Sequence, residues 1–244
     1  MLEGMYAAAA GMNAEQQQLG AISNDLANAS TTGYKSQRTA FKDLLYSQVG
    51  EAGTNTELGA GAVAEAVGRD RAQGTIRQTN NPLDVAIAGE GLLEVKRPDG
   101  SLALTRDGSL QLDSRGRLTT ATGDLMQPPI TIPRGTSASA VSIASDGTVS
   151  ANGRTLGRLS LVTVPAPDGL RAAGTNLFTA TAASGATRRA SAASTIHQGA
   201  LEGSNVDVSG EMVQMIDTQR SYQLQSSAIQ TENQMASIAN ELRS

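Results

Sequence analysis

The fold is decided at the C-terminal end of the chain, where residues 204–244 read SNVDVSGEMVQMIDTQRSYQLQSSAIQTENQMASIANELRS. An apolar residue recurs every seven positions, at Val208, Met215, Tyr222 and Ile229. A second apolar stripe, rotated around the helix, follows at Leu224, Ala228, Met235, Ile238 and Leu242. This spacing predicts one helix of roughly 35 residues, about 50 Å long at about 1.5 Å per residue. Ser204, with Asp207 three residues later, predicts a capping box at its start.

The N-terminal end carries a second helix with a narrow apolar seam. From Leu2 to about Asn28 the heptad positions are again apolar, at Met5, Met12, Leu19 and Leu26, with Ile22 beside them. Gly11 and Gly20 lie inside this helix, and each costs about 1 kcal/mol relative to Ala. The helix is therefore expected to be marginal alone. Short hydroxyl side chains and Gly33 end it, because they favour turns over helix.

Between the two helices the apolar pattern alternates, which is typical of β-strands. Alternating runs occur at Leu83–Ile87, Leu102–Leu104, Leu110–Leu112 and Leu159–Val164. Turn dipeptides fall between them and are expected to supply positive φ at Asp99-Gly100, Asp107-Gly108, Asp146-Gly147, Asn152-Gly153 and Asp168-Gly169. The sequence predicts a central all-β domain of short hairpins.

The predicted fold class is therefore α+β, with long N- and C-terminal helices and a central β-domain. The expected boundaries are residues 1–33 for the first helix, 34–66 for an extended linker, 67–199 for the β-domain and 200–244 for the second helix. Within these ranges, Gly50 to Gly61 is expected as linker, and Thr181 to Ser194 as a loop rich in Ala, Ser and Thr.

Composition excludes several classes of function. The chain has 244 residues, no cysteine and one histidine, which excludes disulfides, thiol nucleophiles, Cys-ligated zinc and a His-rich metal site. Its net charge is -4, and it has no basic tract for binding nucleic acid. Neither a Sec signal peptide nor a transmembrane helix is readable. No cofactor, metal, nucleic acid or small-molecule substrate is expected.

Two patterns resemble sites but have simpler interpretations. Gly59 to Ala64 fits G-x-G-x-x-A, yet no strand precedes it and no βαβ unit surrounds it, so a flexible linker is expected instead of a dinucleotide site. His197 with Glu202 or Asp207 could be drawn as a catalytic triad. No G-x-S-x-G elbow accompanies them, which favours a surface or packed histidine.

The apolar seams of both helices need partners, and we expect neighbouring copies of the chain to supply them. The alternative is an intramolecular two-helix hairpin. The expected assembly interface comprises Met5, Met12, Leu19, Ile22, Leu26, Val208, Met212, Met215, Ile216, Tyr222, Ile229, Met235, Ile238 and Leu242. Contacts that every copy repeats head to tail would propagate a helical filament.

Three separated motifs resemble the flagellar rod and hook proteins of bacteria. Residues 22–35, ISNDLANASTTGYK, are similar to the N-terminal signature of that family, and residues 201–222 resemble its terminal helix. Residues 80–91 and Thr105–Ser109 match the central domain of rod members. The likeness covers nearly the whole chain.

The resemblance implies a structural subunit, not an enzyme, of the rod that passes torque from motor to hook. It implies terminal helices paired coaxially in a coiled-coil-like domain, self-association into a helical polymer, contacts with other rod and hook proteins, and passage through the flagellar export apparatus. The implied location is the basal body in the cell envelope.

Within the family, residues 38–46 and 80–91 are similar to distal-rod members, whereas residues 143–149 and 198–203 are similar to proximal-rod members. The distal type is favoured. A secreted binding module and a hydrolase built on a β-scaffold are the remaining alternatives.

Overall fold

The computed structural model describes residues 2–43, 47–49, 56–58, 61–191 and 193–241. The chain divides into two compact units. One, here called the helical unit, comprises Met1–Ala27, Gln37–Val67 and Asp207–Ser244, and the other, the β-unit, comprises Asn28–Ser36 and Gly68–Val206. Residues 28–33 and 200–206, which the sequence grouped with the terminal helices, therefore belong to the β-unit.

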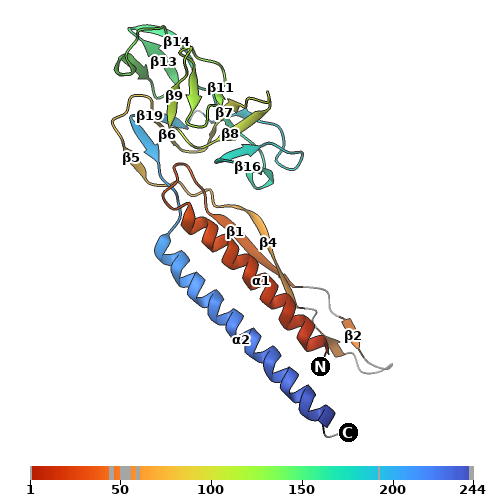
Figure 1. Cartoon of the computed structure of the whole chain (residues 1–244). Coiled ribbons are helices and arrows are strands. Elements are labelled where there is room, and N and C mark those ends of the chain that lie inside the picture. Colours follow the sequence, from red (N-terminus) through yellow and green to blue (C-terminus); the bar gives the residue numbers. More distant parts are fainter. Residues whose placement is uncertain (1, 44–46, 50–55, 59–60, 192, 242–244) are drawn as a thin grey trace. The chain divides into compact units, whose positions relative to one another are not determined.

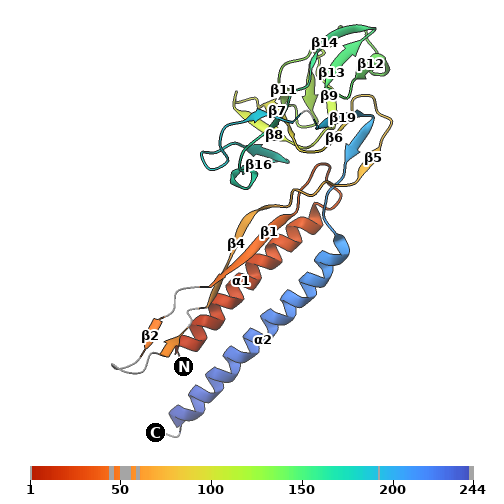
Figure 2. The same cartoon turned by 180° about the vertical axis from the view of Figure 1, so that it is seen from behind.

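The helical unit contains α1 (Leu2–Ala27) and α2 (Val208–Glu241), which lie side by side and run in opposite directions (Figures 1 and 2). The helix predicted from Leu2 to about Asn28 is confirmed. The two helices approach closely at Gly11, where an added Cβ would lie 2.9 Å from Oε1 of Gln225. The two helices thus pair within one chain, as in the intramolecular alternative. Among the described residues, neither helix has the length and apolar character needed to cross a membrane.

The start of α2 differs from the predicted capping box. Asp207 caps the helix, because its Oδ1 accepts a hydrogen bond from the backbone N–H of Ser209 at 3.2 Å. Ser204 lies before the helix. The reason is the intervening Asn205, whose Oδ1 accepts from the backbone N–H of Ser36 at 2.8 Å and so holds this stretch in the β-unit.

The segment expected as a linker forms β structure in the helical unit. Strands β1 (Gln37–Asp43) and β4 (Ala62–Arg69) pair as a ribbon that runs along α1 (Figures 1 and 2), and β2 (Ser47–Val49) pairs with β3 (Thr56–Leu58). Most of Gly50 to Gly61 lies outside the described residues.

The described end of the G-x-G-x-x-A pattern leads into β4. Gly61 has a φ of +94°, and an added Cβ would lie 2.9 Å from Cβ of Ala10, so the strand begins in close contact with α1. Gly59 and Ala60 lie outside the described residues. Gly61 thus contacts a helix and leads into a strand, and not into the helix that follows the glycine turn of a dinucleotide fold.

The strands of the β-unit are short. They are β5 (Ile76–Gln78), β6 (Val85–Ala88), β7 (Leu92–Lys96), β8 (Leu102–Thr105), β9 (Leu110–Leu112), β10 (Leu118–Thr120), β11 (Leu125–Met126), β12 (Val141–Ile143), β13 (Thr148–Ala151), β14 (Arg154–Arg158), β15 (Leu161–Thr163), β16 (Arg171–Gly174), β17 (Leu177–Thr179), β18 (Arg188–Arg189), β19 (Thr195–Gln198) and β20 (Ala200–Glu202). Two short 3-10 helices occupy Ala138–Ala140 and Pro167–Gly169.

The largest sheet has nine strands in the order β16-β17-β8-β7-β11-β10-β9, with β15 pairing β7 and β18 pairing β15. The strands β12-β13-β14 form a second sheet, and two pairs, β19-β6 and β20-β5, join the end of the unit to its beginning. Side chains such as Leu93, Val95 and Met126 are fully buried in the core. The alternating runs at Leu102–Leu104 and Leu110–Leu112 are confirmed as β structure. The other two runs are strand only in part, at Val85–Ile87 and Leu161–Thr163, and Leu83 lies in a turn.

Two of the five turn dipeptides behave differently from the expectation. Gly100, Gly147 and Gly153 have positive φ, but Gly108 and Gly169 do not. At Gly108 the requirement is space, because an added Cβ would lie 1.7 Å from the carbonyl oxygen of Val85. Gly169 likewise leaves room for the backbone of Ser184. The segment Thr181 to Ser194 is mostly loop, with the two-residue strand β18 inside it.

Candidate assembly surface

The predicted interface residues fall into two groups in the structure. A first group is buried or half-buried: Met5, Met12, Leu19, Ile22, Leu26, Met215, Tyr222 and Ile229. A second group is exposed: Val208, Met212, Ile216, Met235 and Ile238. Leu242 lies outside the described residues. The second group leaves the larger apolar surface exposed in the single chain.

The exposed large apolar side chains of α2 make up what we call the outer face. It consists of Val208, Met212, Val213, Ile216, Leu224, Met235 and Ile238. Leu224 is 72% exposed and Val213 is 59% exposed, although neither was among the expected interface residues. Because successive helical residues turn by about 100°, Ile216 and Leu224 lie about 100° to 180° around the helix from Met215, Tyr222 and Ile229. Val208 itself stands at a heptad position, but the rest of the outer face is rotated away from Met215, Tyr222 and Ile229.

The helical unit also concentrates carboxylates. The segment that forms α1 contains no Lys or Arg, and that of α2 contains only Arg220. Burial raises the pKa of Glu211, and the carboxylates of Asp25 and Asp207 raise it further. Burial also raises the pKa of Glu15. Mainly the loss of hydration, and secondly the like charge beside Glu211, therefore opposes the ionisation of these carboxyl groups in the folded chain.

The β-unit contains a buried cluster of ion pairs that the sequence did not predict. Glu202, whose side chain is 1% exposed, accepts from Nζ of Lys35 and from Nε of Arg106, each at 2.6 Å. Its Oε1 also accepts from the backbone N–H of Gly74 at 3.0 Å. We call Lys35, Arg106, Glu202 and the neighbouring Asn205 the junction clamp. Burial of a charge is tolerated only when it is paired in this way.

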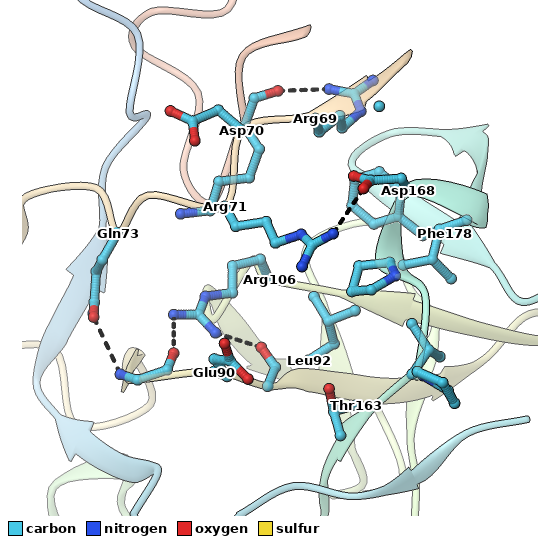
Figure 3. Close-up of a pocket in the computed structure, with 18 residues that line it drawn as sticks. Arg69, Asp70, Arg71, Gln73, Glu90, Leu92, Arg106, Thr163, Asp168 and Phe178 are labelled. Carbon is cyan, nitrogen blue, oxygen red and sulfur yellow. Dashed lines mark hydrogen bonds and ion pairs between the residues drawn. The ribbon is translucent and has the colours of Figure 1, made fainter. Parts of the chain in front are cut away.

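Arg106 fixes the clamp to the loop that follows β6. Its guanidinium donates to the carbonyl oxygens of Ile87 at 3.0 Å and Gly89 at 2.7 Å, and also to that of Gly91. Gln73 binds the same loop. Its amide nitrogen donates to the carbonyl oxygen of Ile87 at 2.8 Å, and its amide oxygen accepts from the N–H of Gly89 at 3.1 Å (Figure 3). All these donors and acceptors are satisfied within the chain.

A cavity of about 410 Å³ opens beside this loop in the β-unit. Figure 3 shows Arg71 reaching Asp168 across it, with the two side chains 2.7 Å apart. The guanidinium of Arg69 lies 5.2 Å from the ring of Tyr34 and 5.3 Å from that of Phe178. These charges already have partners or aromatic neighbours, so the cavity presents no convergent set of free polar groups that would orient a ligand.

The catalytic interpretation of His197 finds no support. The side chain is exposed on β19, and its Nε2 lies 3.4 Å from the hydroxyl of Thr195. Glu202 is engaged by Lys35 and Arg106 instead. Among the described residues, no group of three or more His, Cys, Asp or Glu side chains could hold a metal ion.

Motifs that are far apart in the sequence meet at the junction clamp. The N–H of Gly33 donates to the carbonyl oxygen of Glu202 at 2.8 Å, and the hydroxyl of Thr32 donates to Asp107 at 2.8 Å. The ends of residues 22–35 and 80–91, together with Thr105–Ser109 and the start of residues 201–222, therefore form one packed site. Each of these motifs contains charged or glycine residues that meet at this site, but nothing in the sequence indicated which residues would pair.

Comparison with known proteins identifies the family. Family models match in three places: the flagella basal body rod protein at residues 5–35, the flagellar hook protein FlgE/F/G D1 domain at 86–151, and the flagellar basal body rod FlgEFG protein C-terminal at 197–242. The chain belongs to the flagellar basal-body rod protein family. It is therefore a structural protein of the flagellar basal body.

Full-length relatives indicate the type within the family. The chain is 38% identical over 262 residues to the flagellar basal-body rod protein FlgG of Buchnera aphidicola subsp. Acyrthosiphon pisum, covering 99% of this chain and 100% of the relative. It is 38% identical over 263 residues to FlgG of Borreliella burgdorferi, covering 100% and 99%, and 36% identical over 264 residues to FlgG of Caulobacter vibrioides, covering all of both chains. The FlgG type, which is the distal-rod type, is therefore favoured over the FlgF type, which is the proximal-rod type.

Proposed function

We propose that copies of this chain polymerise through the outer face of α2 into a helical shaft that transmits torque from motor to hook. The observation that carries the proposal is the outer face itself, a set of exposed large apolar side chains on a helix whose other heptad residues are half-buried within the chain. An accumulation of exposed apolar side chains on one helix favours an interaction site. In the polymer, the helical units are proposed to lie around a common axis in a coiled-coil-like arrangement.

The energy available from the outer face suits a repeated contact. Burying one Leu- or Ile-sized side chain contributes about 1.5–3 kcal/mol. Several such side chains per copy, repeated along a lattice, hold a polymer together without any single strong contact. Every copy presents the same surface, so a head-to-tail contact continues into a filament.

The proposed partners follow from the family. They are further copies of this chain, other rod and hook proteins, and the flagellar export apparatus, which would carry the chain into the cell envelope without a Sec signal. Similarity to FlgG proteins supports the distal part of the rod as its place. We propose no catalytic residue, cofactor, nucleic acid or small-molecule substrate.

Sedimentation velocity at rising protein concentration tests the proposal. The wild-type chain is expected to form growing species, and Leu224→Asp is expected to weaken association about 30-fold or more, because about 2 kcal/mol of apolar burial is lost. Gln214→Asp, which adds the same charge at an exposed polar position outside the outer face, is the matched control.

Two results would contradict the proposal. A wild-type chain that stays monomeric at every concentration removes self-assembly. If Leu224→Asp associates as strongly as Gln214→Asp, the outer face is not the contact. Circular dichroism of each variant checks that the helices are retained.

A further inference from the structure

The chain passes between its two units four times, after Ala27, Ser36, Val67 and Val206. Residues 28–36 lie between the first two crossings, residues 68–74 follow the third, and residues 203–206 precede the fourth. These three stretches, here called the crossing segments, all belong to the β-unit. Any load carried along the backbone between the two units must run through them.

The crossing segments are tied to one another by hydrogen bonds within the β-unit. The N–H of Asp70 donates to the carbonyl oxygen of Ser36 at 2.8 Å, and Nη1 of Arg69 donates to that of Lys35 at 2.8 Å. Asn205 joins the third segment, because its amide nitrogen donates to the carbonyl oxygen of Ala72 at 3.1 Å. With its bond to Ser36, this one side chain links all three.

The buried carboxylate of Glu202 strengthens this junction. It binds Lys35 of the first crossing segment and Gly74 of the second, and it precedes the third by one residue. Lys35 binds the second segment again, donating from Nζ to the carbonyl oxygen of Ala72 at 2.7 Å. Arg106, held by three carbonyl oxygens, attaches Glu202 to the body of the β-unit.

We propose that the junction clamp is the mechanical anchor of the subunit. It binds the three crossing segments to one another at one buried ionic site and attaches them to the body of the β-unit. Several hydrogen bonds loaded in parallel resist force better than the same bonds broken one after another. A shaft subunit needs such an anchor, since torque that enters one unit must reach the other without unravelling the chain between them. The mechanical role rests on the proposed function, whereas the coupling of the three segments does not.

Hydrogen exchange measured by mass spectrometry on the full chain tests the coupling. Lys35→Met removes one of the two cations from Glu202 while keeping the length of the side chain. Removing one partner of a buried pair costs enough for all three crossing segments to exchange about a hundredfold faster, together. Residues 92–189 of the large sheet are expected to keep their protection within about threefold.

Arg71→Met is the matched control. Arg71 lies in the second crossing segment, but its ion pair with Asp168 is exposed at 59% and 42%, so little change is expected. The coupling is refuted if Lys35→Met loosens only the residues that Lys35 contacts. It is equally refuted if the large sheet loses protection as much as the crossing segments do, because Lys35 then supports the whole fold and not the junction.

Single-molecule pulling tests the load. The chain has no cysteine, so Arg134→Cys in the β-unit and Gln230→Cys in α2 give two unique attachment points at exposed positions. The first rupture is expected at a markedly lower force in Lys35→Met than in Arg71→Met, with the later rupture of the large sheet unchanged. Equal first-rupture forces would overturn the anchor. Both measurements use the monomer, so a failure to polymerise would count against the proposed function alone.

Discussion

Replacing Glu202 by Gln should be among the most damaging conservative changes in the β-unit. The change keeps the shape of the side chain but removes its charge, leaving Lys35 and Arg106 with only 12% and 7% of their side chains exposed and no carboxylate between them. The new amide also replaces one acceptor by a donor, which faces at least one of the donors that bind Glu202. Removing one member of a buried ion pair costs about 3–5 kcal/mol. For a unit of this size that lowers the melting temperature by about 6–20 °C.

Thermal unfolding followed by circular dichroism measures the effect, with urea titration as a second measure of the free energy of unfolding. Asp168→Asn is the matched control, since it makes the same change of carboxylate to amide in an exposed pair of the same unit. That control should cost no more than about 1 kcal/mol. Unlike Lys35→Met, Glu202→Gln also breaks the ion pair with Arg106 in the body of the β-unit. If the two variants lose the same stability within about 0.5 kcal/mol, that ion pair does not support the β-unit.

Three further predictions concern the backbone and the helices. Gly20→Ala should stabilise α1 by about 1 kcal/mol, because nothing lies within 4 Å of the added Cβ. Gly33→Ala should cost about 2 kcal/mol or more, because Gly33 has a φ of +65° and the added Cβ would lie 2.7 Å from the backbone of Arg106. Urea titration measures the free energy of unfolding of both variants. The pKa of Glu211 is raised in the folded chain, so the ionisation of this carboxyl group opposes folding. Glu211→Gln should therefore raise the melting temperature of the helices at pH 7. Melting curves recorded across pH should show that this gain vanishes as the pH falls below the ordinary pKa of the carboxyl group. Ile229→Asp, on the half-buried stripe of α2, should lower helix content while the transition of the β-unit stays in place, which calorimetry can resolve.

The helices were the most predictable part of the structure, because their signal is local. The heptad positions from Met5 to Leu26 place α1 to within a residue of its observed end. The start of α2 could not be placed as well. Asn205 bonds to the backbone of Ser36, 169 residues away in sequence, and that bond determines where the helix begins. The β1-β4 ribbon escaped notice because its residues are mostly exposed and carry few large apolar side chains.

The candidate assembly surface was likewise predictable only where its signal is local in the sequence. Heptad spacing identified the apolar residues of α2, but it could not tell which of them would pack on α1 and which, like Ile216 and Ile238, would remain exposed. The junction clamp lay beyond sequence reasoning because Glu202 is 167 residues from Lys35 and 96 from Arg106. The sequence places these charged residues within motifs, and only the fold shows which residue each of them pairs with.

The central claim, that this chain is a structural subunit of the rod, is tested most directly by electron microscopy of basal bodies from a strain that lacks it. We expect rods that stop short of their full length and carry no hook, with full-length rods restored by the wild-type chain. Complete rods with hooks attached in the absence of this chain would contradict it.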